Sequence, residues 1–194
     1  MLYLRKYLKL TNYNKSKLVA EFLADKIKEF DQLLFKKPLP VSICQIHPND
    51  ELTVACFNPE KSLLYKLLGF KGEYVIFQNH LEKIYGKEEY LISVAAHEVR
   101  HRFQLANRNC LIQQSYLEKN IIIDIETVKF VKDKVSLRKE DPKHYPFEFD
   151  ASLIQKLIFD LISIKIPQPS EIKTILSITP KTINKVQALL NGLL

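Results

Sequence analysis

The stretch from Glu88 to Leu105 constrains the fold of this chain more than any other, because its pattern predicts one long amphipathic helix. Its apolar residues recur near the 3.6-residue period of an α-helix, and neither Pro nor Gly interrupts it. The residues that lead to its centre, Ser93 to Ala96, are small or apolar, as expected for a helix buried in the middle of a domain. The sequence therefore predicts a central helix against which the other elements pack.

This helix carries the motif His97-Glu98-Val99-Arg100-His101. Residues four apart lie on one face of a helix, one turn apart, so His97 and His101 are expected to bind a single metal ion together. Glu98 is then expected to lie beside the ion, where its carboxylate can take a proton from a water molecule. A chance match to so short a pattern is the alternative. The arrangement suits metal-assisted hydrolysis of a peptide bond.

A third ligand must come from elsewhere, because catalytic zinc usually keeps three protein ligands and one open position. Asn107 stands six residues after His101, so a third His is missing there. Glu148 is the best candidate, since it opens a second apolar helix that Pro146 begins. Asp150 either replaces Glu148 as the ligand or orients an imidazole by accepting its other N–H. The simpler alternative is that both acids only favour the helix N-terminus through the helix dipole.

Three further residues are weaker candidates for the site. Glu126 is a third possible ligand, although it is more simply part of the polar face of an intervening helix. His144 and Tyr145 precede the presumed ligand, and either one can act as a donor to a reacting carbonyl oxygen. The remaining histidines, His47 and His80, are interpreted as surface or hydrogen-bonded residues.

Two segments resemble a known family. The helix from Val94 to Gln104 resembles the active-site helix of the zincin metallopeptidases, and the segment from Tyr145 to Ala151 is similar to the second signature of small bacterial gluzincin-like proteins. The resemblance implies Zn²⁺, a third acidic ligand on a downstream helix, and a zincin-like fold. One departure is that Pro146 stands four residues before Asp150, where the family usually has Glu, so the roles of Glu148 and Asp150 can be exchanged.

The fold expected for this chain is α+β: a mainly helical zincin-like domain with a small sheet beside the active-site helix. The strand at Tyr74 to Asn79 is the candidate edge for pairing with a peptide substrate, and the alternative is an ordinary central strand. The other expected elements are a helix from Asn14 to about Phe35, strands at Val41 to Ile46, Leu52 to Phe57 and Glu73 to Gln78, a turn at His47 to Asp50, and a short helix at Pro59 to Leu68.

The C-terminal part is expected to form a helical hairpin after the break at Pro167-Gln168-Pro169. This divides the chain into residues 1–166, the metallopeptidase domain, and residues 167–194, which are too few to be stable alone. In DNA-binding proteins the second helix of such a hairpin enters the major groove. The polar residues that DNA contact would use are Lys181, Thr182, Asn184 and Lys185. A structural cap is the favoured interpretation, since any helical hairpin has this spacing.

The composition limits the class of protein to which this chain can belong. A chain of 194 residues with 46% hydrophobic and 26% charged residues suits one globular domain, and no apolar run approaches the length of a membrane span. Cys44, Cys56 and Cys110 are widely spaced and odd in number, and we expect reduced, mostly buried thiols in a cytoplasmic protein. The net charge of +7 is spread along the chain, which indicates a solvated surface rather than a binding patch.

The sequence therefore predicts a zinc-dependent metallopeptidase that acts on a protein or peptide. Glu98 is the expected general base, and His97, His101 and Glu148 are the expected metal ligands. Two alternatives stay open. One is a regulatory protein of mobile-element type that cleaves or binds a repressor-like partner, and the other is a non-catalytic binding module that a metal stabilises.

Overall fold

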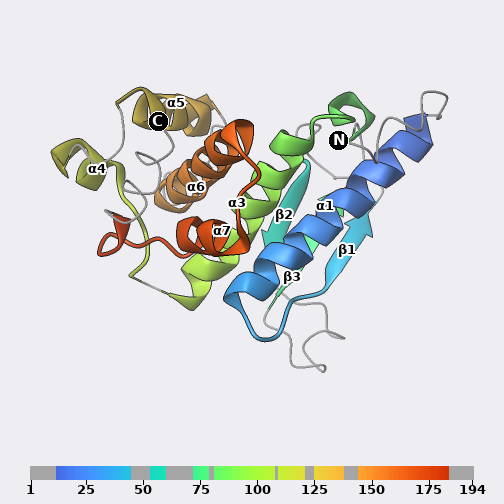
Figure 1. Ribbon diagram of the computed structural model, residues 1–194, viewed down its shortest axis with the longest axis horizontal. Helices are drawn as coiled ribbons and strands as arrows, with labels where there is room; N and C mark the ends of the chain where they lie inside the picture. The colour runs from blue at the N-terminus through green and yellow to red at the C-terminus, as the bar shows by residue number, and fades with distance from the viewer. Residues whose placement is uncertain are drawn as a thin grey trace.

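The computed structural model describes residues 12–44, 53–59, 72–78, 81–107, 109–120, 125–137 and 144–183. These residues form a mainly helical fold with one small sheet, which confirms the predicted α+β class (Figure 1). The elements in chain order are α1 (Asn12–Leu34), β1 (Val41–Cys44), β2 (Ala55–Asn58), β3 (Glu73–Phe77), the 3₁₀ helix η2 (Leu81–Ile84), α3 (Glu88–Ala106), α4 (Gln114–Asn120), α5 (Ile125–Leu137), α6 (Tyr145–Ile164) and α7 (Pro169–Leu176).

Helix α3 is the central element, as the sequence predicted. It packs against α1 and β2 on one side and against α6 and α7 on the other (Figure 1). An amphipathic surface helix buries one stripe, whereas α3 buries side chains around most of its circumference. The buried residues are Leu91, Ser93, Val94, Ala95, Ala96, His97, Glu98, Val99, Arg100 and Gln104. The small residues before the motif allow the neighbouring elements to approach, which places the motif in the interior.

The sheet has the strand order β1-β3-β2, with β1 parallel and β2 antiparallel to β3. The prediction that Tyr74 to Asn79 forms a free edge is wrong, because Tyr74 pairs with Val41 on one side and with Phe57 on the other. Tyr74 and Ile76 are fully buried, as is usual for a central strand. Within the described residues, β2 is instead the edge of the sheet that lies next to α3.

Helix α1 confirms the predicted N-terminal helix and is anchored near its end by a buried carboxylate. Asp31 accepts hydrogen bonds from the Tyr74 hydroxyl at 2.7 Å and from the Leu39 backbone N–H at 2.8 Å. Arg102 of α3 also donates to Asp31. The Asp31 carboxylate therefore links α1 to the central strand β3 and to the central helix α3. These contacts hold the sheet next to the helix that carries the motif His97 to His101.

The described part of the C-terminal segment packs into the same core as the rest of the chain. Ile172, Ile175, Leu176, Ile178 and Ile183 all belong to that core. The second helix of the predicted hairpin is described only up to Ile183, so Asn184 and Lys185 lie outside the described residues. The predicted turn at His47 to Asp50, residues 60–68 of the predicted helix from Pro59 to Leu68, and His80 also lie outside them. Among the described helices, none has the length and apolar character needed to cross a membrane.

A buried ion pair connects α3 to α6. The side chains of Arg100 and Asp150 are both 0% exposed, and the guanidinium donates through Nε at 2.6 Å and through Nη2 at 2.8 Å to the two carboxylate oxygens. Arg100 also donates to the backbone carbonyls of Leu176, Ile178 and Cys110. These five hydrogen bonds use all the donors that a guanidinium possesses, so the buried charge is fully satisfied.

We expect Asp150→Ala to destabilise the protein by about 3–5 kcal/mol, because it leaves the Arg100 charge buried without its partner. Asp160→Ala on the same helix is the matched control. Asp160 and its partner Lys156 are both partly exposed to solvent, so that loss should stay below about 1 kcal/mol. Urea unfolding measures both changes. Equal losses for the two variants would contradict a special role for the buried pair.

Candidate metal centre

The structure brings together the three residues that the sequence predicted as metal ligands. His97 and His101 lie one turn apart on α3, and Glu148 reaches them from the first turn of α6. The two Nε2 atoms are 3.1 Å apart. Glu148 Oε2 is 3.3 Å from His97 Nε2, and Glu148 Oε1 is 3.1 Å from His101 Nε2. One ligand atom from each residue can therefore face a common point.

These spacings fit a zinc ion. Zinc binds imidazole nitrogen and carboxylate oxygen at about 2.0–2.1 Å, which places neighbouring corners of a tetrahedron about 3.3 Å apart. The two imidazole Nε2 atoms, 3.1 Å apart, are close to that value, and each of them lies 3.1 or 3.3 Å from a different oxygen of Glu148. Two imidazoles and one carboxylate also leave the fourth corner open, as in catalytic zinc sites. The geometry and the chemistry of the three side chains both suit this ion.

The same three residues are strongly coupled in charge. Burial lowers the pKa of His101, but hydrogen bonding and charge from Glu148 outweigh that effect and raise the pKa to about 9. Burial likewise raises the pKa of Glu148, but hydrogen bonds and charge from His101 and His97 hold that pKa well below its usual range. The cluster therefore keeps an ionised carboxylate against the imidazoles, and a metal cation can replace the proton that they share.

Asp150 does not take either of its predicted roles. Its carboxylate accepts from Arg100, from the Ile112 backbone N–H at 2.9 Å and from Gln104 Nε2 at 2.7 Å, so it neither joins the ligand cluster nor contacts an imidazole. Residues two apart on a helix point about 200° apart, which sends Asp150 into the α3–α6 interface while Glu148 faces the histidines. Glu126 is exposed on α5 and is not in the cluster either.

The hydrogen bond predicted for Asp150 is made by Gln104 instead. Its Oε1 lies 2.9 Å from His101 Nδ1, the ring nitrogen away from the ligand cluster. Gln104 stands three residues after His101 and shares its helix face. That spacing was present in the sequence, and it is the signal by which this residue could have been found.

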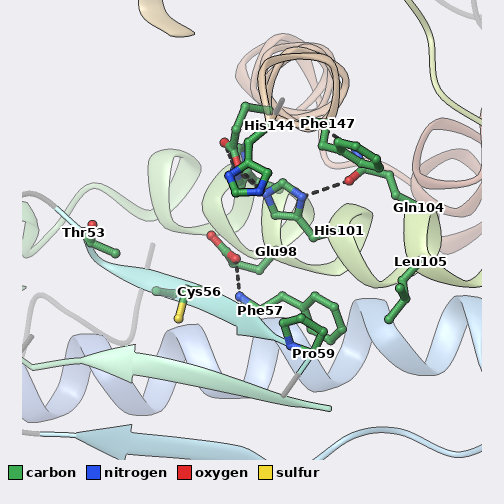
Figure 2. Close-up of a pocket in the computed structure, with 13 residues that line it drawn as sticks. Thr53, Cys56, Phe57, Pro59, Glu98, His101, Gln104, Leu105, His144 and Phe147 are labelled. Carbon is green, nitrogen blue, oxygen red and sulfur yellow. Dashed lines mark hydrogen bonds and ion pairs between the residues drawn. The ribbon is translucent and has the colours of Figure 1, made fainter. Parts of the chain in front are cut away.

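Glu98 lies beside the ligand cluster, as predicted, and is 6% exposed. Its Oε2 accepts a hydrogen bond of 2.7 Å from the backbone N–H of Phe57 on β2. Figure 2 shows its carboxylate between the strand and the His101 ring. The edge strand thus holds the carboxylate near the ligand cluster, an arrangement that no local pattern in the sequence could indicate.

The candidate ligands and Glu98 line one cleft of about 370 Å³ (Figure 2). Its walls come from β2, α3 and the start of α6, and the apolar part of the lining is Ala55, Phe57, Pro59, Leu105 and Phe147. His144 also lines the cleft, so its predicted role as a donor to a carbonyl stays a prediction. Tyr145 is not positioned for that role, because its hydroxyl donates to Gln114 at 3.1 Å in a separate depression.

Cys56 lines the cleft but is not a reactive thiolate. Burial, and then the negative charge of Glu98, raise the pKa of its thiol to about 12. The three cysteines form no disulfide, and of the three only Cys110 is buried, so the expectation of mostly buried thiols is wrong. The thiol that borders the cleft is therefore protonated at neutral pH, and it is not part of the ligand cluster.

Comparison with known proteins gives no relative: no protein-family model, curated protein or solved structure matches this chain. The chemistry of the cleft therefore has to be argued from its own residues.

We expect Zn²⁺ to raise the melting temperature of the wild-type protein and to raise that of Glu148→Gln much less. At a free ion concentration 100 times Kd, binding adds about 2.7 kcal/mol to the free energy of unfolding. Glu126→Gln makes the same chemical change on the exposed face of α5 and should respond to zinc as the wild type does. Differential scanning fluorimetry with and without zinc measures the shifts. A full zinc response in Glu148→Gln would remove that residue from the ligand set.

Proposed function

We propose that this protein is a zinc-dependent metallopeptidase of zincin type. The observation that supports this most directly is the meeting of His97, His101 and Glu148, at separations that suit one tetrahedral ion, with Glu98 in the same cleft. A central helix that carries both histidines, a small mixed sheet beside it and a later helix that supplies the carboxylate also agree with a zincin-like architecture. A solvent-open cleft beside the three residues gives a substrate access to the ion.

In this proposal the protein holds the ion through His97 Nε2, His101 Nε2 and a Glu148 oxygen. When bound, zinc polarises the scissile carbonyl and makes a water molecule more acidic. Glu98 accepts a proton from the attacking water as the oxygen–carbon bond forms. It then gives that proton to the departing amine nitrogen as the carbon–nitrogen bond breaks. The products are a carboxylic acid and an amine, and no other reactant is needed.

The edge of β2 is the surface that we propose binds the peptide backbone. Phe77 N–H donates to Val54 O at 2.9 Å, so Val54 and Phe77 form a hydrogen-bonded pair of the antiparallel ladder. Because such pairs alternate, the backbone groups of Ala55 and Phe57 point away from β3 and toward the cleft. An extended peptide can add to this edge as a further strand through the backbone groups of Ala55 and the Phe57 carbonyl, since the Phe57 N–H already donates to Glu98. The proposed substrate edge thus moves from β3 to β2.

The position of Glu98 favours hydrolysis over a purely structural metal site. A structural zinc site is closed by four protein ligands and has no use for a carboxylate beside the ion. Here the described residues offer three ligands, and the Phe57 backbone holds Glu98 in the same cleft. Contact of the C-terminal segment with DNA stays a prediction, because Asn184 and Lys185 lie outside the described residues.

We expect Glu98→Gln to keep its zinc and to lose hydrolysis, with kcat reduced about 10²- to 10⁴-fold, because an amide cannot take the proton from water. Glu89→Gln, at the exposed start of the same helix, is the matched control and should keep full activity. Mass spectrometry of a peptide library incubated with each zinc-loaded protein measures cleavage, and elemental analysis measures the metal. Stoichiometric zinc in a wild-type protein that cleaves no peptide would favour the non-catalytic module.

A further inference from the structure

We infer that Gln104 is a positioning residue that presents His101 to the metal through Nε2 and ties this ligand to the segment of α6 that carries Glu148. The inference rests on the proposed metal site. Gln104 is 4% exposed, and its amide makes three hydrogen bonds. One joins its Oε1 to His101 Nδ1 at 2.9 Å. The other two run from its Nε2 to Phe147 O at 2.9 Å and to Asp150 Oδ2 at 2.7 Å.

The partners of Gln104 determine which way its amide faces. A backbone carbonyl oxygen and an ionised carboxylate can only accept hydrogen bonds, so the end of the amide that contacts Phe147 and Asp150 must be the NH₂ group. The carbonyl end then faces His101. Turning the amide over would place its oxygen against two other acceptors, at the cost of both bonds.

The direction of the amide in turn determines the state of the His101 ring. Because the Gln104 oxygen can only accept, His101 Nδ1 must carry the hydrogen. With that hydrogen on Nδ1, the neutral ring has its lone pair on Nε2, which lies 3.1 Å from both Glu148 and the His97 ring. The nitrogen that faces the cluster is therefore the one able to bind a cation.

Gln104 is itself held firmly on both sides. Asp150 is fully buried and is fixed by Arg100 and by the Ile112 backbone N–H, so the carboxylate that orients the amide has little freedom. Phe147 is the residue before Glu148. A single amide thus links the His101 ring on α3 to the α6 backbone next to the second ligand, and it sets the distance between the two ligands.

The test replaces the amide with an apolar side chain of similar length. Gln104→Met removes all three hydrogen bonds, and we expect the zinc affinity to fall about 10- to 100-fold, as is usual when a partner of a ligating His is lost. Gln155→Met is the matched control. Gln155 is also a buried glutamine, 6% exposed, and it bonds to Lys134 and Ser93 rather than to a histidine. Its loss should leave the zinc affinity unchanged.

Competition with a chromophoric chelator measures the affinities, and urea unfolding of the metal-free proteins shows how much stability each variant loses. If Gln104→Met and Gln155→Met lose stability alike and both bind zinc like the wild type, Gln104 is only a packing residue and the inference fails. If the wild type itself binds no zinc, the proposed metal site fails, and this role fails with it. The two failures are therefore distinguishable.

A second measurement needs no variant. In the zinc-loaded wild-type protein, a ¹H–¹⁵N correlation spectrum that observes histidine ring nitrogens should place a proton on Nδ1 of His101, with the metal on Nε2. A proton on Nε2 and a metal on Nδ1 would overturn the inference, whatever the affinities are.

Discussion

The buried pair of Arg100 and Asp150 is the interaction on which the site depends. A guanidinium taken out of water costs several kcal/mol unless each of its donors finds a partner, and here all five do. The partners come from α6, from the last residue of α7 and the turn that follows it, and from Cys110. A side chain inside the motif therefore sets how α6 lies against α3, and this places Glu148 against the two histidines. The carbonyls of Leu176 and Ile178 belong to the segment beyond residue 166, so the described part of that segment supports the site.

The parts of the structure that could be predicted are those that local spacing determines. The central helix follows from an uninterrupted 3.6-residue pattern, and the histidine pair follows from a separation of four residues on that helix. The choice of Glu148 over Asp150 followed only from the position of Glu148 at the start of an apolar helix, since both are acids two residues apart. What separates them is a long-range contact. Asp150 pairs with Arg100 in the α3–α6 interface, and no local sequence pattern around Asp150 indicates this partner.

The sheet was harder to predict, for a related reason. Strand β3 was recognised from its apolar, β-branched and aromatic residues, but those residues suit a central strand and an edge strand alike. The order of strands depends on pairing between segments far apart in sequence. Val41 and Phe57 both pair with Tyr74, one parallel and one antiparallel, and no local pattern encodes that choice. The sequence predicts a strand at Leu52 to Phe57, but only the structure shows that this strand borders the cleft and that Phe57 contacts Glu98.

Glu98 and Glu148 line this cleft, and Asp150 lies in the α3–α6 interface; the partners of these three carboxylates give each a different task. Glu148 faces two imidazoles, which keep it ionised and suit it to a cation. Asp150 faces a guanidinium that uses both of its oxygens, so it is fully occupied as a structural anion. Glu98 accepts a hydrogen bond at one oxygen from the Phe57 backbone N–H, and a neutral donor binds a carboxylate less strongly than a charged donor does. Because the donor to Glu98 lies on the strand that we propose pairs with the peptide, the substrate and the base are positioned by the same piece of backbone. A peptide paired with β2 would therefore lie along the same strand that holds Glu98.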